Sequence, residues 1–144
     1  MKLVSYTESG NERLGIIVDD KIYNLSENAH SYGKGMLPDN MADFLSYGEN
    51  AMEIAKAVEK KIKENNITGI HSTATEKDLL APVPHPTSCR DGYAFRQHVE
   101  TARRNRKVPM IPEFDQYPVF YFTNHNAIQG PGDVYCMPDH FDKL

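Results

Sequence analysis

Three prolines within five residues constrain this chain more than any other feature. They stand in the segment Ala81-Pro82-Val83-Pro84-His85-Pro86. Proline lacks a backbone N–H and restricts the residue before it to extended conformations, so this segment cannot continue a helix or a central strand. It favours an extended, polyproline-like connection. We therefore expect a first domain over residues 1–80, a proline-rich linker over 81–87 and a second part over 88–144.

Short apolar runs separated by turn residues fill the beginning of the chain. Residues 2–6 alternate in polarity, and residues 13–18 and 21–25 are two further runs. The turn chemistry of Glu8-Ser9-Gly10-Asn11 and Asp19-Asp20 stands between them. The pattern predicts an antiparallel meander. Three short strands bury little surface alone, so the meander must pack on something else.

An amphipathic pattern over residues 49–64 predicts a helix. Its apolar positions recur at helical spacing: Ala51, Ile54, Ala55, Val58 and Ile62. A shorter helix is expected over 41–45, capped by Asp39 or Asn40, and a short strand over 67–70. Strands and helices together predict a small α+β domain.

The second part, residues 88–144, has a different pattern of predicted elements. Residues 92–106 are predicted to form a helix, and residues 117–122 a strand that is dense in aromatic side chains. Gly130-Pro131-Gly132-Asp133 is a tight turn. The cluster from Arg103 to Lys107 suits a solvated helix end, where cations complement the helix dipole.

Composition excludes several classes of function. The chain has 144 residues, a net charge of −4 and two cysteines. No run approaches the ~20 apolar residues of a membrane helix, and the start has no apolar segment of a signal peptide. We expect no membrane or nucleic-acid partner, no disulfide scaffold and a cytoplasmic location.

The stretch from Arg90 to Glu100 carries the candidate chemistry. Asp91 and His98 are seven residues apart, which on a helix is about two turns, or roughly 10 Å along one face. That spacing is too long for a direct dyad, but the two side chains could address the two ends of one small substrate. A carboxylate binds a hard cation and an imidazole moves a proton. The simpler alternatives are an N-cap role for Asp91 and a packed or surface role for His98.

The order of several motifs resembles the fumarylacetoacetate hydrolase family. The motifs are Ala81-Pro82-Val83-Pro84, the Asp-x-Tyr-x-x-x-Gln-His pattern of residues 91–98, Pro118-Val119-Phe120-Tyr121-Phe122 and Gly130-Pro131-Gly132-Asp133. The start of the chain also looks like the start of those proteins. The resemblance spans nearly the whole chain. It implies that the second part begins a mixed-β catalytic fold of that family and is incomplete.

The resemblance also implies roles for individual residues. Asp91 matches a metal-binding aspartate, His98 matches the histidine that activates water, and Tyr93 matches an aromatic residue that contacts substrate. Family members bind Mg²⁺, Ca²⁺ or Mn²⁺ and act on C–C bonds of small β-diketo or α-keto acids, although some relatives decarboxylate, isomerise or hydrate. A cationic partner for the substrate carboxylate is expected at Arg106 or Lys107, whose alternative role is a solvated helix end.

The remaining metal ligands of the family follow the Gly-Pro-Gly-Asp turn and have no counterpart here. One aspartate cannot supply the six or more oxygens that such an ion needs. We therefore expect an enzyme fragment that binds no metal tightly and is inactive alone. The alternative is a non-catalytic binding or dimerisation module, in which the exposed aromatic strand makes a homodimer or an element-swapped oligomer. A zinc-binding protein is disfavoured, because the known zinc motifs do not match the spacing of four histidines: His85, His98, His125 and His140.

Overall fold

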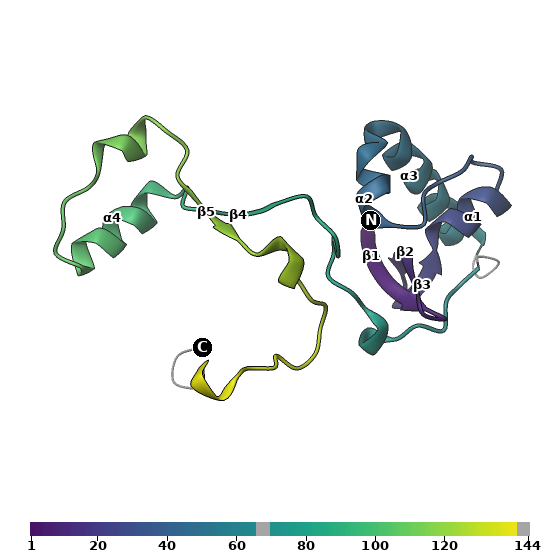
Figure 1. The fold of residues 1–144 in the computed structure, drawn as a ribbon. Helices are drawn as coiled ribbons and strands as arrows, with labels where there is room; N and C mark the ends of the chain where they lie inside the picture. The colour runs from purple at the N-terminus through teal and green to yellow at the C-terminus, as the bar shows by residue number, and fades with distance from the viewer. Residues whose placement is uncertain (66–69, 141–144) are drawn as a thin grey trace. The chain divides into compact units, whose positions relative to one another are not determined.

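The computed structural model describes residues 1–65 and 70–140 (Figure 1). The chain divides into two units. The first contains Met1–Pro84 with the residues from Ile128 onward, and the second is His85–Ala127. Each unit is described by itself. The predicted domain boundaries at residues 80 and 87 stay a prediction.

The first unit is built on a three-stranded antiparallel sheet of β1 (Lys2–Glu8), β2 (Asn11–Val18) and β3 (Lys21–Asn24), in the order β1-β2-β3. This is the predicted meander. Both hairpins close with two residues at positive φ, namely Ser9-Gly10 and Asp19-Asp20. Such turns match the right-handed twist of the strands.

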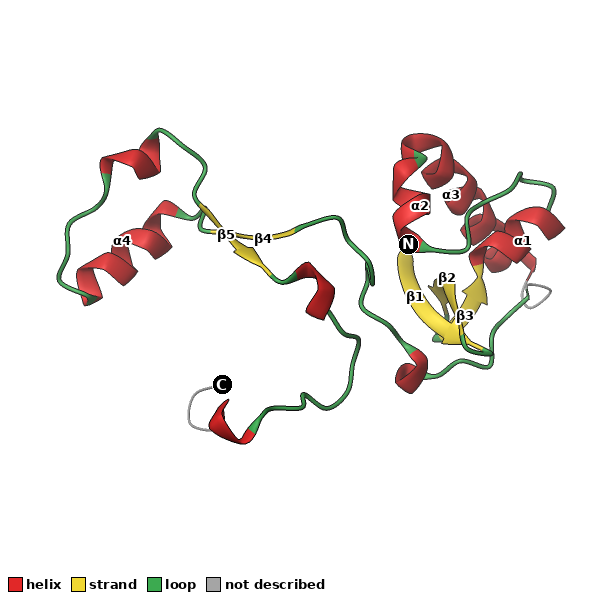
Figure 2. Ribbon diagram, viewed as in Figure 1, coloured by secondary structure: helices red, strands yellow, loops and turns green. Residues whose placement is uncertain are grey.

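Three helices pack on one face of this sheet: α1 (Leu25–Ser31), α2 (Met41–Ser46) and α3 (Gly48–Asn65) (Figure 2). The apolar face predicted for the long helix is confirmed, since Ala51, Ala55, Val58 and Ile62 are buried and Ile54 is half-buried. Asn40 caps α2, with its Oδ1 accepting a hydrogen bond from the Asp43 N–H at 2.9 Å. These elements confirm the α+β class.

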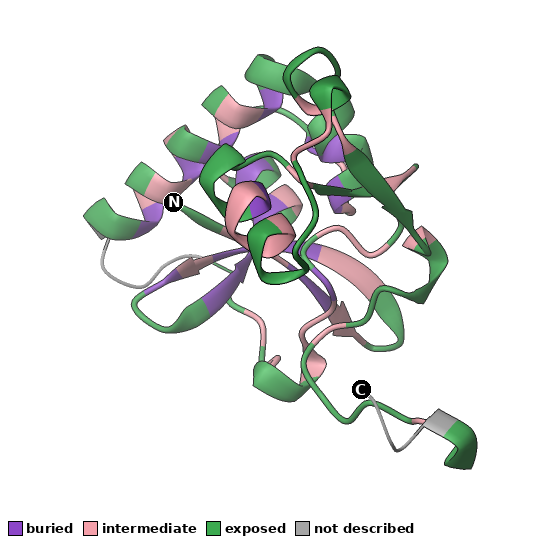
Figure 3. Ribbon diagram, turned by 90° about the vertical axis from the view of Figure 1, so that its left-hand side faces the viewer, coloured by how far each residue is buried: buried purple, intermediate pink, exposed green. Residues whose placement is uncertain are grey.

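Most of the buried hydrophobic residues of the first unit form one core between helices and sheet (Figure 3). Its largest fully buried members are Phe44, Leu14, Ile16, Leu25 and Val58. The short helix α1 belongs to this core although no sequence pattern predicted it. Asn24 caps it, accepting a hydrogen bond from the Glu27 N–H at 3.1 Å.

Both edges of the sheet are covered by later segments of the same unit. On the β3 side, Tyr23 bridges to His71 and the Ser72 N–H donates to the Ile22 carbonyl at 2.8 Å. On the β1 side, Tyr6 bridges to Leu79. Covering the edges removes unpaired backbone groups that would otherwise template aggregation. The strand predicted over 67–70 lies almost wholly outside the described residues.

The second unit holds a two-stranded antiparallel sheet and one α-helix: β4 (Cys89–Gly92), β5 (Phe120–Thr123) and α4 (Arg96–Asn105). A 3₁₀ turn, η2 (Pro112–Asp115), stands between α4 and β5. Among the described hydrophobic residues of this unit, only Val99 is buried. In the part of the chain that the structure describes, no helix is long and apolar enough to cross a membrane.

The expected start of the second helix was wrong. Residues 92–95 were predicted to open it, with an N-cap as the alternative role of Asp91, whereas α4 begins at Arg96 and Asp91 lies in β4. The reason is a tertiary one. Residues 89–92 pair with 120–123, so Asp91 lies opposite Tyr121 in the ladder. Phe95 takes the N-cap position and makes no side-chain capping bond.

Candidate functional site

The three predicted site residues lie along β4, the turn after it and the first turn of α4. Asp91 is exposed in β4, Tyr93 follows the strand, and His98 is the third residue of α4. Three residues, 93–95, connect strand to helix. The 10 Å separation of Asp91 and His98 that a continuous helix would give therefore does not apply.

Tyr93 and His98 are in direct contact. Their ring centroids are 5.8 Å apart and the ring planes meet at 87°, an edge-to-face pair. Edge-to-face pairs of this kind are favourable because a ring edge is positive and a ring face is negative. The structure thus brings two of the three predicted site residues together. No hydrogen bond or ion pair is described between Asp91 and either of them.

The hydroxyl of Tyr93 is the least satisfied group of this site. Its oxygen is buried and has no hydrogen-bond partner among the described residues. A buried hydroxyl without a partner costs roughly 1–3 kcal/mol. A water molecule or a ligand oxygen at this position would remove that cost.

Asp91 shares one face of the small sheet with Tyr121. Directly opposite residues of an antiparallel pair project to the same side, and Asp91 is the register partner of Tyr121. Arg90 occupies the other face, where its guanidinium carbon lies 5.4 Å from the ring centroid of Phe120 and 5.1 Å from that of Phe122. Sequence reasoning missed Tyr121 as a neighbour of Asp91, since only the strand register reveals it.

Asp91 is predicted to be one ligand of a divalent cation. A hard divalent cation needs six or more oxygen ligands, and one carboxylate supplies at most two. Among residues 1–65 and 70–140, no group of three or more His, Cys, Asp or Glu side chains is close enough to hold an ion. These residues do not fit a Mg²⁺ site by themselves.

The basic cluster at the end of α4 takes part in a C-terminal helix cap. The Lys107 N–H donates to the Arg104 carbonyl at 2.9 Å, and the Val108 N–H donates to the Arg103 carbonyl at 3.1 Å. This pair of bonds is a Schellman motif. Lys107 is the residue of this motif that adopts the left-handed conformation, with φ of 57°. Whether Arg106 or Lys107 meets a substrate carboxylate stays a prediction.

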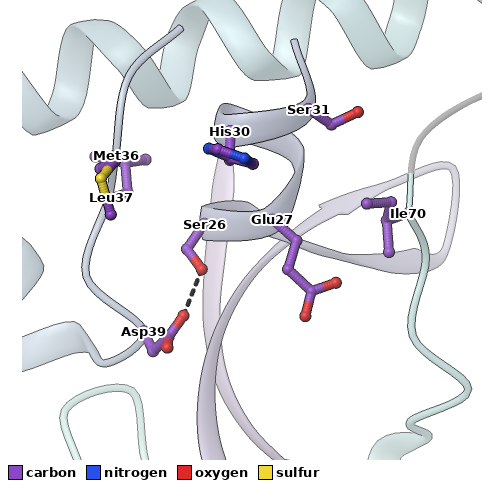
Figure 4. Close-up of a pocket in the computed structure, with 8 residues that line it drawn as sticks. All are labelled: Ser26, Glu27, His30, Ser31, Met36, Leu37, Asp39 and Ile70. Atoms are coloured by element: carbon purple, nitrogen blue, oxygen red, sulfur yellow. Dashed lines mark hydrogen bonds between the residues drawn. The ribbon is translucent and has the colours of Figure 1, made fainter. Parts of the chain in front are cut away.

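A separate hollow of about 490 Å³ lies in the first unit, beside α1 (Figure 4). The Ser26 hydroxyl donates a short hydrogen bond to Asp39 at its rim. The other lining residues are Glu27, His30, Ser31, Met36, Leu37 and Ile70. None of the predicted site residues lines it, and no sequence pattern pointed to it.

Comparison with known proteins adds no relative. No protein-family model matches the chain, and no curated protein matches it. The resemblance to the fumarylacetoacetate hydrolase family therefore remains an interpretation of the motifs.

Proposed function

We propose that the chain supplies part of the active site of a metal-dependent hydrolase or lyase. The substrate class is a small β-diketo or α-keto acid whose C–C bond is cleaved, as in the fumarylacetoacetate hydrolase family. Tyr93 contacts the substrate, His98 handles a proton, and Asp91 is one of several oxygen ligands of a Mg²⁺, Ca²⁺ or Mn²⁺ ion. Alone, the chain is inactive.

One observation carries this proposal: the buried hydroxyl of Tyr93 has no described partner and stands on a ring that packs against His98. An orphaned buried donor is uncommon in folded proteins and calls for an explanation. A phenol of this kind donates well to a carbonyl or carboxylate oxygen. A keto acid offers both, so a keto acid that reaches this oxygen would satisfy the hydroxyl of a ring that contacts the imidazole.

His98 is suited to proton transfer by type and by position. It is exposed, so a water molecule and a substrate can both reach it. Histidine is the side chain that most often serves as a general base near neutral pH. Its contact with Tyr93 restricts the orientation of the imidazole.

The test is binding and turnover of an acylpyruvate by the purified chain. We expect millimolar acetylpyruvate to shift the backbone amide resonances of residues 91–98, and to shift them less in Tyr93→Phe. Tyr47→Phe is the matched control, because Tyr47 is an exposed tyrosine of the first unit. The ultraviolet absorbance of the substrate should stay constant with added Mg²⁺. Shifts spread evenly over the chain, or turnover by this chain alone, would contradict the proposal.

The second candidate function is a non-catalytic dimerisation module, which the exposure of β5 favours. Phe120, Tyr121 and Phe122 are 42%, 72% and 63% exposed. Clusters of exposed aromatic side chains usually mark an interaction surface. On this alternative, light scattering gives a dimer mass that Tyr121→Ser reduces to a monomer mass and Tyr47→Ser does not. A monomer mass at every concentration would eliminate it.

A further inference from the structure

The connection between α4 and β5 is fastened to the helix at two points. Arg96 and Arg103 are seven residues apart on α4, about two helical turns, so they share a face. The Arg103 Nε–H donates to the Pro109 carbonyl. At the far end of the connection, Arg96 binds Asp115 in η2. The segment from 107 to 115, which we call the clasped loop, therefore lies along α4.

The Arg96–Asp115 pair has the geometry of a two-pronged fork. Arg96 Nε lies 3.0 Å from Asp115 Oδ1, and a terminal guanidinium nitrogen lies 3.1 Å from Oδ2. Arg96 also pairs with Glu100 one turn along the helix. Two parallel N–H···O bonds fix direction as well as distance. Exposed ion pairs usually contribute at most about 1 kcal/mol, but the bidentate geometry of this one makes it stronger than a single contact and holds the loop in one orientation.

The position so fixed is that of Phe114, the residue before Asp115. Its ring centroid is 6.3 Å from that of Tyr93, and the planes meet at 86°. Tyr93 thus contacts Phe114 on one side and His98 on the other. The three rings make a chain of edge-to-face contacts that runs from the clasped loop to the imidazole.

We infer that Phe114 and Arg96 are positioning residues for the candidate site: the clasped loop holds Phe114 against Tyr93, and Tyr93 in turn sets the orientation of His98. This inference rests on the proposed function only in giving His98 a chemical role. The geometry itself can be tested without substrate or metal. Sequence reasoning missed Phe114 because it lies 16 positions after His98 within a loop of no regular pattern.

The experiment is NMR spectroscopy of the 144-residue chain with labelled aromatic side chains. Contacts appear as cross-relaxation between the Tyr93 ring and the imidazole protons of His98, and between the Tyr93 and Phe114 rings. In Phe114→Leu, which keeps an apolar side chain but removes the ring, we expect the Tyr93–His98 signal to fall about threefold, as befits loss of one favourable ring pair. Phe114→Tyr keeps an aromatic ring, so it should keep the Tyr93–His98 signal. Phe95→Leu, which removes an 81% exposed ring, should also leave that signal unchanged.

A second variant separates positioning from general loss of structure. Asp115→Asn removes the charge that holds the fork but leaves all three rings in place. It should weaken both ring contacts while the β4–β5 cross-strand signals persist, whereas Glu113→Gln, a charge change two residues earlier, should weaken neither. The inference is overturned if Tyr93 and His98 keep their signal and imidazole shifts in both Phe114→Leu and Asp115→Asn. Failure of the acylpyruvate assay alone would instead count against the proposed function.

Discussion

Asn28 is a buried polar side chain of α1 that makes three hydrogen bonds. It is fully buried. Its Nδ2 donates to the Asn24 carbonyl at 2.6 Å and to the Ile70 carbonyl at 2.8 Å, and its Oδ1 accepts from the Ile70 N–H at 2.8 Å. One side chain thus joins α1 to the segment that covers the edge of β3.

Replacing Asn28 by alanine removes all three hydrogen bonds at once. At about 1 kcal/mol of net stability for each bond, the loss would be about 3 kcal/mol. The backbone groups of Ile70 can recover part of it by binding water, since Ile70 is 44% exposed. We expect unfolding free energy to fall by about 2–3 kcal/mol.

Urea denaturation followed by circular dichroism measures this loss. With a slope of about 1–1.5 kcal/mol per M, the midpoint should fall by about 2 M. Asn50→Ala is the matched control, because Asn50 is exposed on α3 and alanine favours a helix. Its midpoint should hold or rise slightly.

The isosteric variant Asn28→Asp refines the test. One oxygen can still accept from the Ile70 N–H, but the other faces the two carbonyl oxygens that Nδ2 now binds. The neutral acid is therefore favoured in the folded state, and its pKa there lies above the unfolded value of about 3.9. The variant should lose stability relative to the natural chain as the pH rises from 3 to 8. An Asn28→Ala loss below about 0.5 kcal/mol, or a pH-independent Asn28→Asp loss, would show that these three hydrogen bonds do not stabilise the first unit.

Four further predictions concern single positions. Gly130→Ala should detach its segment from Leu79, because a Cβ would collide with that backbone carbonyl, and hydrogen exchange there should quicken. Lys107→Gly should stabilise the end of α4 by about 1 kcal/mol in thermal melts, because glycine accepts a left-handed backbone without strain. Burial and, to a lesser degree, the charge of Glu8 raise the pKa of Tyr6 from 10.0 to about 12, so stability should fall as pH rises between those values, and Tyr6→Phe should remove that fall. A lysine hydrogen bond lowers the pKa of Glu59, so its contribution is present above the ordinary pKa, is lost as pH falls through the lowered one, and should vanish in Glu59→Gln.

Each of these has an outcome that would count against it. Unchanged exchange in Gly130→Ala would mean that the segment does not dock as described, and a destabilised Lys107→Gly would contradict the Schellman geometry. For the two titrations, stability would depend on pH in the same way in Tyr6→Phe or Glu59→Gln as in the natural chain. That result would show that Tyr6 or Glu59 does not cause the pH dependence.

Local patterns predicted the elements that are stabilised locally. The helix α3 is long and amphipathic, and the hairpin turns have strong turn chemistry, so both were predictable. The helix α1 was not, because its seven residues have no clear period and Asn28 joins it to Ile70, which is distant in sequence. The start of α4 was misplaced for a similar reason: Asp91 looks like a helix cap in sequence, but pairing with a strand some 30 residues later determines its conformation.

The residues of the candidate site likewise fall into those that the local sequence predicts and those that only the tertiary structure reveals. Asp91, Tyr93 and His98 were predicted as a site because they are close in sequence and match a motif. Phe114 and Tyr121 come near them only through the clasped loop and the register of β4 and β5. Neither contact has a signature in the order of the residues.

The proposed function requires that Asp91, Tyr93 and His98 belong to one site, to which Asp91 would contribute one of several oxygen ligands of a divalent cation. Paramagnetic broadening by Mn²⁺ tests this most directly, since it maps a weak metal site residue by residue. We expect low-affinity broadening centred on residues 91–93 and extending to the imidazole of His98, lost in Asp91→Asn and retained in Asp133→Asn. Broadening that is centred elsewhere, or that survives in Asp91→Asn, would show that Asp91 is not a ligand of such an ion.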